Sequence, residues 1–173
     1  YLQLHEQIDQ RVYDMAAQVT AGITTPYGKA LALQNFLASN FVYDLDVPQQ
    51  PANQDFVSTF LVETKAGYCT YFASAMTVMC RMVGLPARYV EGYMDSTKAG
   101  KTTVVRESRA HAWVEYYIEG IGWLIMDPTP SDSSTPDQNT PSTPPTSSTT
   151  PPGPTPSTTT KPTGPTDPNS TTL

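Results

Sequence analysis

The sequence has little cysteine, little histidine and no long apolar run. It holds 2 Cys and 2 His among 173 residues, and neither a CxxC nor an HExxH motif occurs, so a zinc site is not expected. No stretch is long and apolar enough to cross a bilayer, and no signal peptide stands at the start. Lys and Arg total 10 against 16 Asp and Glu, a net charge of −6. Nucleic acids and anionic membranes need a positive footprint, so we expect neither as a partner of this segment.

Large aliphatic side chains are almost absent from residues 131–173, which contain 11 Pro, 14 Thr and 8 Ser. Such a segment cannot bury enough apolar surface to offset its ordering entropy. We therefore predict one domain over residues 1–130 and a disordered linker or stalk over 131–173. Stalks of this composition commonly separate an extracytoplasmic domain from a wall or membrane anchor; an ordinary interdomain linker is the alternative. A chain that starts without Met and stops inside this run is interpreted as a piece of a longer, tethered protein.

Helices are predicted first along the chain and strands afterwards. Apolar residues at helical spacing predict helices over residues 1–20, 26–39 and 69–83. A polar loop and a short helical turn near 55–61 separate the last two. Three strands follow, over residues 87–94, 109–120 and 122–127, with a polar loop at 95–103. This order indicates an α+β fold rather than a doubly wound sheet.

The two cysteines stand in different surroundings. Cys69 lies at the predicted start of the third helix, whereas Cys80 lies within its apolar face. The partial positive charge and unpaired N–H groups of a helix start stabilise a thiolate and can bind an oxyanion. On one helix the two residues would be ~16 Å apart, too far for a disulfide. We predict two free thiols, of which Cys69 is the nucleophile.

A reactive thiol needs a base, and the chain offers two histidines. His5 has polar neighbours on the first predicted helix and is interpreted as a surface residue. His111 begins a strand; alone it could be only a satisfied polar residue, but beside a helix-start cysteine it is the candidate base. Asp127 ends the next apolar strand and could hold the imidazole in its useful tautomer, although an Asp-Pro turn is common there. Glu115, the competing acid, lies further along the same face of the strand and points parallel to His111.

Three stretches together resemble the signature blocks of the transglutaminase-like superfamily, a branch of the papain-like cysteine enzymes. They are GYCTYFASAMTVMCRMVGLPARYVEGY, HAWVEYY and GWLIMDPTP. Their order Cys, His, Asp agrees with the family, at spacings of 42 and 16 residues. The resemblance covers about residues 55–130, and the flanking segments resemble bacterial members in which this domain lies outside the membrane. It implies a papain-like fold with helices packed on an antiparallel sheet.

The resemblance also implies a mechanism. The thiolate of Cys69 would attack the carboxamide of a protein glutamine, His111 would protonate the departing ammonia, and Asp127 would orient His111. A primary amine or water would then resolve the thioester. Two alternatives stay open: a cysteine peptidase or amidase acting on a peptide or cell-wall cross-link, and a non-catalytic protein-binding module on the same fold. Loss of the triad residue Cys69, His111 or Asp127 would indicate the binding module, and none of the three is lost.

Further roles are assigned to a few residues near these blocks. Tyr68 and Trp113 are candidates for substrate binding, and Arg88 and Glu115 are expected to be structural, as a pair inside the sheet. Five tyrosines could either line a substrate cleft or pack: Tyr71, Tyr89, Tyr93, Tyr116 and Tyr117. The upstream tryptophan with which animal transglutaminases help to bind the oxyanion has no counterpart, and their calcium sites have no support. We expect a protein or peptide substrate, no cofactor, no metal, and a monomer.

Overall fold

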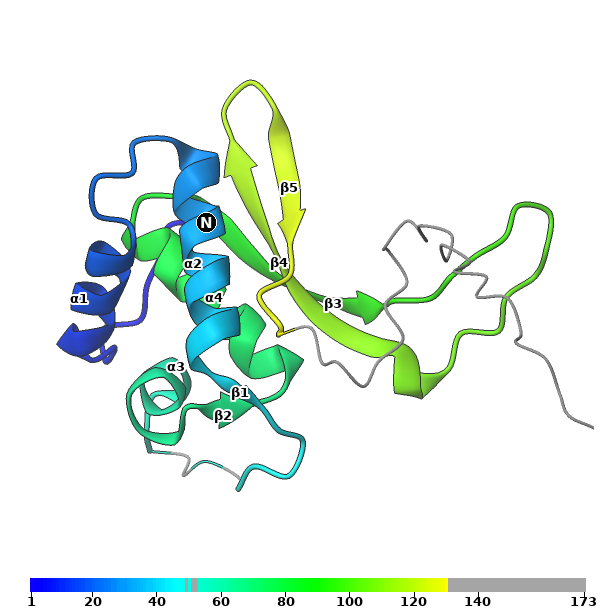
Figure 1. Ribbon diagram of the computed structural model, residues 1–173, viewed down its shortest axis with the longest axis horizontal. Coiled ribbons are helices and arrows are strands. Elements are labelled where there is room, and N and C mark those ends of the chain that lie inside the picture. Colours follow the sequence, from blue (N-terminus) through cyan, green and yellow to red (C-terminus); the bar gives the residue numbers. More distant parts are fainter. Residues whose placement is uncertain (49, 51–52, 131–173) are drawn as a thin grey trace, which may run out of the picture. The chain divides into compact units, whose positions relative to one another are not determined.

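Helices and a three-stranded sheet make up most of the described chain, which is residues 1–48, 50 and 53–130 of a computed structural model (Figure 1). In chain order the elements are α1 (Gln10–Val19), α2 (Pro26–Asn40), β1 (Val42–Tyr43), α3 (Phe56–Ser58), a π-helical turn (Thr59–Thr64), β2 (Ala66–Gly67), α4 (Cys69–Met82), β3 (Ala87–Tyr93), a 3-10 turn (Glu107–Arg109), β4 (Ala110–Ile118) and β5 (Gly122–Met126). The predicted α+β class is confirmed. The segment predicted to be disordered, 131–173, lies outside the described residues.

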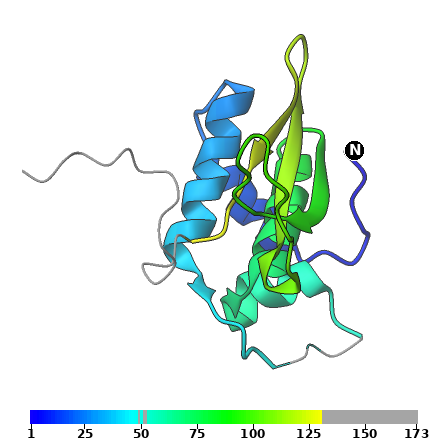
Figure 2. The ribbon, with the colours of Figure 1, turned by 90° about the vertical axis from the view of Figure 1, so that its right-hand side faces the viewer.

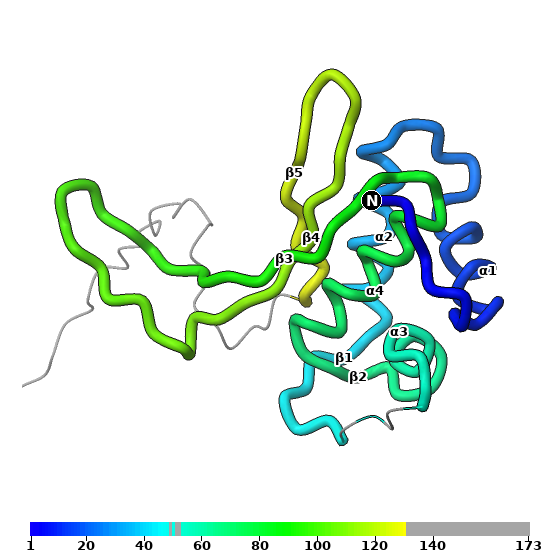
Figure 3. The backbone as a smooth tube through the Cα atoms, turned by 180° about the vertical axis from the view of Figure 1, so that it is seen from behind, coloured from blue at the N-terminus to red at the C-terminus, as the bar shows by residue number. Residues whose placement is uncertain are grey.

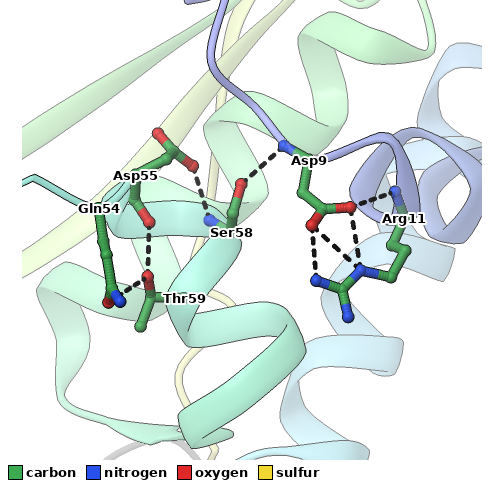
Figure 4. Close-up of polar contacts among 6 residues, drawn as sticks. All are labelled: Asp9, Arg11, Gln54, Asp55, Ser58 and Thr59. Carbon is green, nitrogen blue, oxygen red and sulfur yellow. Dashed lines mark hydrogen bonds and ion pairs between the residues drawn. The ribbon is translucent and has the colours of Figure 1, made fainter.

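The first helix is shorter than predicted, because it begins at Gln10 rather than near residue 1. The Asp9 carboxylate caps it by accepting from the backbone N–H of Arg11 at 2.8 Å, and the Asp9 N–H donates to the Ser58 hydroxyl at 2.9 Å (Figure 4). The residues before it lie against β3 and α4 instead: the Ala87 N–H donates to the carbonyl of Tyr1 at 3.0 Å. His5 is therefore exposed, as predicted, but it precedes the helix.

The second helix begins where the sequence indicated. Pro26 is its first residue, and the Thr25 hydroxyl accepts from the Gly28 N–H at 3.2 Å. The predicted turn near residue 55 is α3 followed by the π-helical turn; the Asp55 carboxylate accepts from the Ser58 N–H at 2.7 Å (Figure 4). These caps satisfy N–H groups that a helix start otherwise leaves without a partner.

A short parallel pair that the sequence did not predict precedes the third long helix. Strand β1 pairs with β2, with Val42 opposite Ala66 and Tyr43 opposite Gly67. The Val42 N–H donates to the carbonyl of Lys65 and the Asp44 N–H to that of Gly67, both at 2.9 Å. Because Cys69 follows β2 after a single residue, this pair holds the backbone that leads into α4.

The antiparallel sheet has the order β3-β4-β5. Helix α4 packs against the face that carries Ala112, Val114 and Tyr116, all buried. Burying this face, with Phe72, Met76 and Met79 of α4 fully enclosed, supplies much of the hydrophobic stabilisation. The long helices lie on one side of the sheet, and residues 94–109, a longer connection than predicted, extend away from them (Figures 1 and 3). The tip of the β4–β5 hairpin also extends beyond the helices (Figure 2).

Candidate active site

Cys69 is the first residue of α4, as predicted, and its side chain is half-buried. The pKa of its thiol lies below the ordinary value for cysteine. The largest cause is a hydrogen bond with the His111 side chain; burial opposes it, and the backbone N–H groups of Ala112 and Thr70 add to the lowering. All three groups stabilise a negative sulfur. The geometry therefore favours a thiolate at this position.

His111 joins the other two predicted residues. Its Nε2 lies 2.6 Å from Oδ2 of Asp127, which leaves Nδ1 as the ring nitrogen available to the Cys69 thiol. The hydrogen bond with Asp127 is the largest cause that raises the pKa of His111 to about 10, the bond with Cys69 is the next, and burial opposes both. The lowered pKa of the thiol and the raised pKa of the imidazole both favour the thiolate–imidazolium form of this pair.

Asp127 directly follows β5, and its position is fixed from two sides. Its carboxylate accepts from the Thr129 N–H at 2.9 Å, and the Gln34 side chain of α2 donates to its backbone carbonyl at 2.7 Å. Burial raises the pKa of Asp127, but the hydrogen bonds from His111 and Thr129 outweigh burial, so the net pKa is lowered. An ionised carboxylate is thus aimed at the imidazole.

The competing acid has a different partner. Glu115 pairs across the sheet with Arg88, and its Oε2 lies 2.5 Å from a guanidinium nitrogen of that residue. The guanidinium also lies over the ring of Trp123, 4.2 Å from its centroid. This pairing occupies Glu115 and leaves Asp127 as the acid that contacts His111.

Each of the two residues assigned to substrate binding adjoins one of the three candidate catalytic residues. Trp113 stacks beside His111, with centroids 6.5 Å apart and an interplanar angle of 22°. It also covers Gly92, where an added Cβ would lie 2.6 Å from the indole ring. The Trp113 Nε1 is buried and has no acceptor among the described residues. Tyr68 caps α4 through its backbone, and its ring meets that of Tyr71 edge-on at 4.9 Å.

Sequence reasoning missed three contributors to this site. Gln34 and the Ala112 N–H gave no signal, since one acts from a distant helix and the other through the backbone. Tyr89 was left between packing and lining a cleft. The structure places its hydroxyl 3.5 Å from that of Thr70, the residue after Cys69. Burial is the largest cause that raises the pKa of Tyr89 to about 12, and the charge of the Cys69 thiolate contributes to the rise.

Within residues 1–48, 50 and 53–130, no group of three or more His, Cys, Asp and Glu side chains is placed to hold a metal ion. In the same part of the chain, no helix has the length and apolar character needed to cross a membrane. The two cysteines are free thiols; Cys80 is fully buried, and burial raises its pKa to about 12.

A cysteine at a helix start, a strand histidine and an acid after the next strand, on this α+β fold, define the papain-like class of cysteine-enzyme folds. Within that class, the chain belongs to the transglutaminase-like superfamily, whose family model matches residues 13–128. The sequence-based resemblance to this superfamily is confirmed. Its members are generally cysteine enzymes.

Several bacterial proteins are similar to the chain. It is 38% identical over 137 residues to the uncharacterized protein YebA of Bacillus subtilis, covering 75% of this chain and 19% of YebA. It is 42% identical over 102 residues to a protein-glutamine gamma-glutamyltransferase of Pseudomonas aeruginosa, covering 58% of this chain and 15% of that protein. The crystal structure of the periplasmic domain of TgpA from Pseudomonas aeruginosa superposes with a TM-score of 0.63 at 35% identity, covering 73% of this chain and 44% of that one. The chain thus spans less than a fifth of those two curated relatives.

Proposed function

We propose that this domain transfers the acyl group of a glutamine side chain through a thioester on Cys69. The observation that carries the proposal is the arrangement of the Cys69 thiol, with its lowered pKa, against an imidazole held by Asp127 at 2.6 Å. The name of the Pseudomonas relative, protein-glutamine gamma-glutamyltransferase, supports the same chemistry. The roles of Cys69 as nucleophile, His111 as acid and base, and Asp127 as its orienting partner belong to this proposal.

The first half-reaction forms the thioester. The Cys69 thiolate attacks the carbonyl carbon of the carboxamide, and negative charge collects on the carbonyl oxygen. Backbone N–H groups at the start of α4, beginning with that of Cys69, are the proposed donors to this oxygen. The His111 imidazolium then gives its proton to the leaving nitrogen, the C–N bond breaks, and ammonia departs. Tyr68 and Trp113, beside Cys69 and His111, are proposed to contact the glutamine-bearing peptide.

The second half-reaction resolves the thioester with a primary amine or with water. Neutral His111 takes a proton from the incoming nucleophile, the C–S bond breaks, and the thiolate is restored. We further propose that the domain, residues 1–130, works outside the cytoplasm, since TgpA is represented by a periplasmic domain, and that residues 131–173 tether it.

The proposal is tested by measuring the alkylation rate of each cysteine as a function of pH. Iodoacetamide is the alkylating reagent, and mass spectrometry quantifies the label on each cysteine. In the wild type, Cys69 should be labelled rapidly near pH 6, because its hydrogen bonds lower the pKa of the thiol and favour the reactive thiolate. His111→Ala should remove this rapid labelling. Cys80, buried and with a pKa of about 12, is the internal control and should stay unlabelled in the folded protein. A Cys69 rate that rises only near pH ~8.5, as for an ordinary thiol, would contradict the activated pair.

The acyl chemistry is tested by offering a glutamine-containing protein and a fluorescent alkylamine. Wild-type protein should incorporate the amine and release ammonia, and Cys69→Ala should do neither while keeping its thermal midpoint within a few degrees, since a first-turn substitution costs about 1 kcal/mol. Ammonia release without incorporation would assign water as the acceptor. If the wild type neither incorporates the amine nor releases ammonia, but Cys69 is still alkylated rapidly near pH 6, the peptidase or amidase alternative is favoured.

A further inference from the structure

An unpaired carboxylate lies close to the nucleophile, on the side of the site away from Asp127. Glu91 is an exposed residue of β3, and the Tyr89 hydroxyl donates to its Oε1 at 2.5 Å. The same hydroxyl lies 3.5 Å from that of Thr70, which directly follows Cys69. One tyrosine therefore links this carboxylate to the first turn of α4.

The strand register places Glu91 beside the same group. Glu91 lies opposite Ala112 in the β3–β4 ladder, and the Ala112 N–H is one of the donors to the Cys69 thiolate. Side chains alternate between the two faces of a strand, so Tyr89 and Glu91 both lie on the face of β3 that packs toward α4. Cys69 is the first residue of α4, the helix that contacts both β3 and β4.

Charge distinguishes Glu91 from the other carboxylates of the site. Asp127 is neutralised by His111, and Glu115 by Arg88. No Lys, Arg or His pairs with Glu91 in the described part of the chain. Glu91 thus offers a negative charge, held in place by Tyr89, to whatever approaches Cys69 from this side.

We propose that Glu91, positioned by Tyr89, binds the cationic ammonium group of the acyl acceptor next to the thioester on Cys69. This inference rests on the proposed function and names the residue that would select its acceptor: Glu91 would favour a cationic primary alkylamine, such as a lysine side chain, over uncharged or anionic nucleophiles. The ammonium group bound by Glu91 first loses one proton to solvent, and the resulting amine attacks the thioester carbonyl. A second proton passes from the amine nitrogen to neutral His111. The C–S bond then breaks to leave the amide and the Cys69 thiolate.

The test uses an acyl donor that does not depend on glutamine recognition. p-Nitrophenyl acetate acylates a reactive thiol and releases nitrophenolate, and amines then accelerate turnover by removing the acetyl group. The amine concentration for half-maximal acceleration is measured for n-pentylamine, which is cationic at neutral pH, and for hydroxylamine, which is uncharged. Cys69→Ala supplies the background rate of direct aminolysis.

Glu91→Gln should raise the half-maximal n-pentylamine concentration by about two- to fivefold, the change expected when one exposed ion pair is lost. The hydroxylamine value and the initial nitrophenolate burst should not change. Added salt should raise the n-pentylamine value of the wild type and have little effect on Glu91→Gln. Tyr89→Phe should act in the same direction as Glu91→Gln. Glu119→Gln, an exposed acid in the β4–β5 turn at the far end of β4, is the matched control and should behave as wild type.

The outcomes separate this inference from the function on which it rests. A wild-type n-pentylamine value in Glu91→Gln, or an equal change for n-pentylamine and hydroxylamine, would overturn the inference alone. If the wild type shows the nitrophenolate burst but n-pentylamine does not accelerate its later turnover, the acceptor site is overturned and the domain is a hydrolase. No burst in the wild type would remove the nucleophile, and both proposals with it.

Discussion

His111 lies between the two groups that set its charge. Asp127 stabilises the protonated ring from Nε2, and the Cys69 thiolate does so from the other nitrogen; burial opposes both and is outweighed. The raised pKa of His111 therefore favours the protonated imidazole that the proposed first half-reaction needs, up to a pH of about 10. Single hydrogen bonds at this residue should therefore set the pH range of the proposed chemistry.

Asp127→Asn should narrow that range. In the wild type, kcat/KM for glutamine transfer should rise as the Cys69 thiol ionises and fall as His111 loses its proton near pH 10. Asparagine removes the main cause of the raised His111 pKa, so the falling limb should move to lower pH. The rate should also fall, by up to ~10⁴-fold if the wrong imidazole tautomer dominates, as in a well-studied triad.

The measurement is kcat/KM from pH 5 to pH 11, with Glu119→Gln as a control that should retain the wild-type profile. An Asp127→Asn profile with its falling limb still near pH 10, and a displaced limb in Glu115→Gln instead, would transfer the orienting role to Glu115.

At the scale of elements, the start of α4 depends on the two-residue strand before it. Gly67 is buried and pairs with Tyr43 of β1, and a Cβ placed on it would lie 2.4 Å from Cγ of the Tyr71 ring. Only a glycine lets β2 approach the first turn of α4 so closely. The position of Cys69, two residues on, follows from this contact.

Gly67→Ala should therefore cost about 1–3 kcal/mol of unfolding free energy, the usual cost of inserting a methyl group into a packed core. It should also slow the alkylation of Cys69 near pH 6, since Tyr71 must shift and move the helix start. Chemical denaturation gives the first quantity and iodoacetamide labelling the second. Gly67→Ala combined with Tyr71→Ala should show coupling between the two sites; strict additivity, or an unchanged midpoint in the single variant, would disprove the close approach.

The sequence predicted those elements whose signals are local. The Thr25-Pro26 start of α2, Cys69 at the start of α4 and the β4–β5 hairpin each depend on neighbouring residues, and the structure has them where expected. One prediction was wrong and one pair of strands was missed. Residues 1–9 have apolar residues at helical spacing, but Tyr1 hydrogen-bonds to Ala87 and Ser58 accepts from Asp9, contacts that no local pattern contains. The β1–β2 pair was missed because two residues per strand show no periodicity.

The candidate site follows the same division. Cys69, His111 and Asp127 were predicted from the places of a thiol, an imidazole and an acid relative to their own elements, and the structure brings the three together. Gln34, Tyr89 and the Ala112 N–H depend on how α2, β3 and β4 meet around them, and no spacing within the chain reports that. Their roles, like those of the triad, stay predictions until the variants are measured.

On the scale of the whole molecule, the triad joins α4, β4 and the end of β5, so its charges bear on folding as well as on chemistry. The pKa of His111 is raised from 6.5 to about 10 on folding. The stabilisation that results is fully present below pH 6.5 and is lost as the pH rises through about 10. The pKa of Asp127 is lowered from 3.8, so its contribution is present above pH 3.8 and is lost as the pH falls below it.

The difference in thermal midpoint between the wild type and His111→Ala should therefore shrink as the pH is raised from 6.5 to about 10. Differential scanning fluorimetry across this range measures it, and subtracting the variant removes the titration of other groups. His5→Ala, at the exposed histidine, should follow the wild type throughout. A constant difference between wild type and His111→Ala would show that the imidazole gains no charge stabilisation in the folded state.

The separation of the two cysteines along α4 has a consequence for oxidative damage. Peroxide oxidises a thiolate to a sulfenic acid, and a second thiol that captures this acid as a disulfide protects it from further oxidation. The chain's other thiol, Cys80, is eleven residues further along the same helix, about 16 Å away, and fully buried. Within this chain Cys69 has no resolving partner, so continued oxidation proceeds to sulfinic and sulfonic acids, which are not reduced back. Oxidants would therefore inactivate such a site irreversibly. Protection would have to come from a small-molecule thiol or from an acyl group already bound to the sulfur.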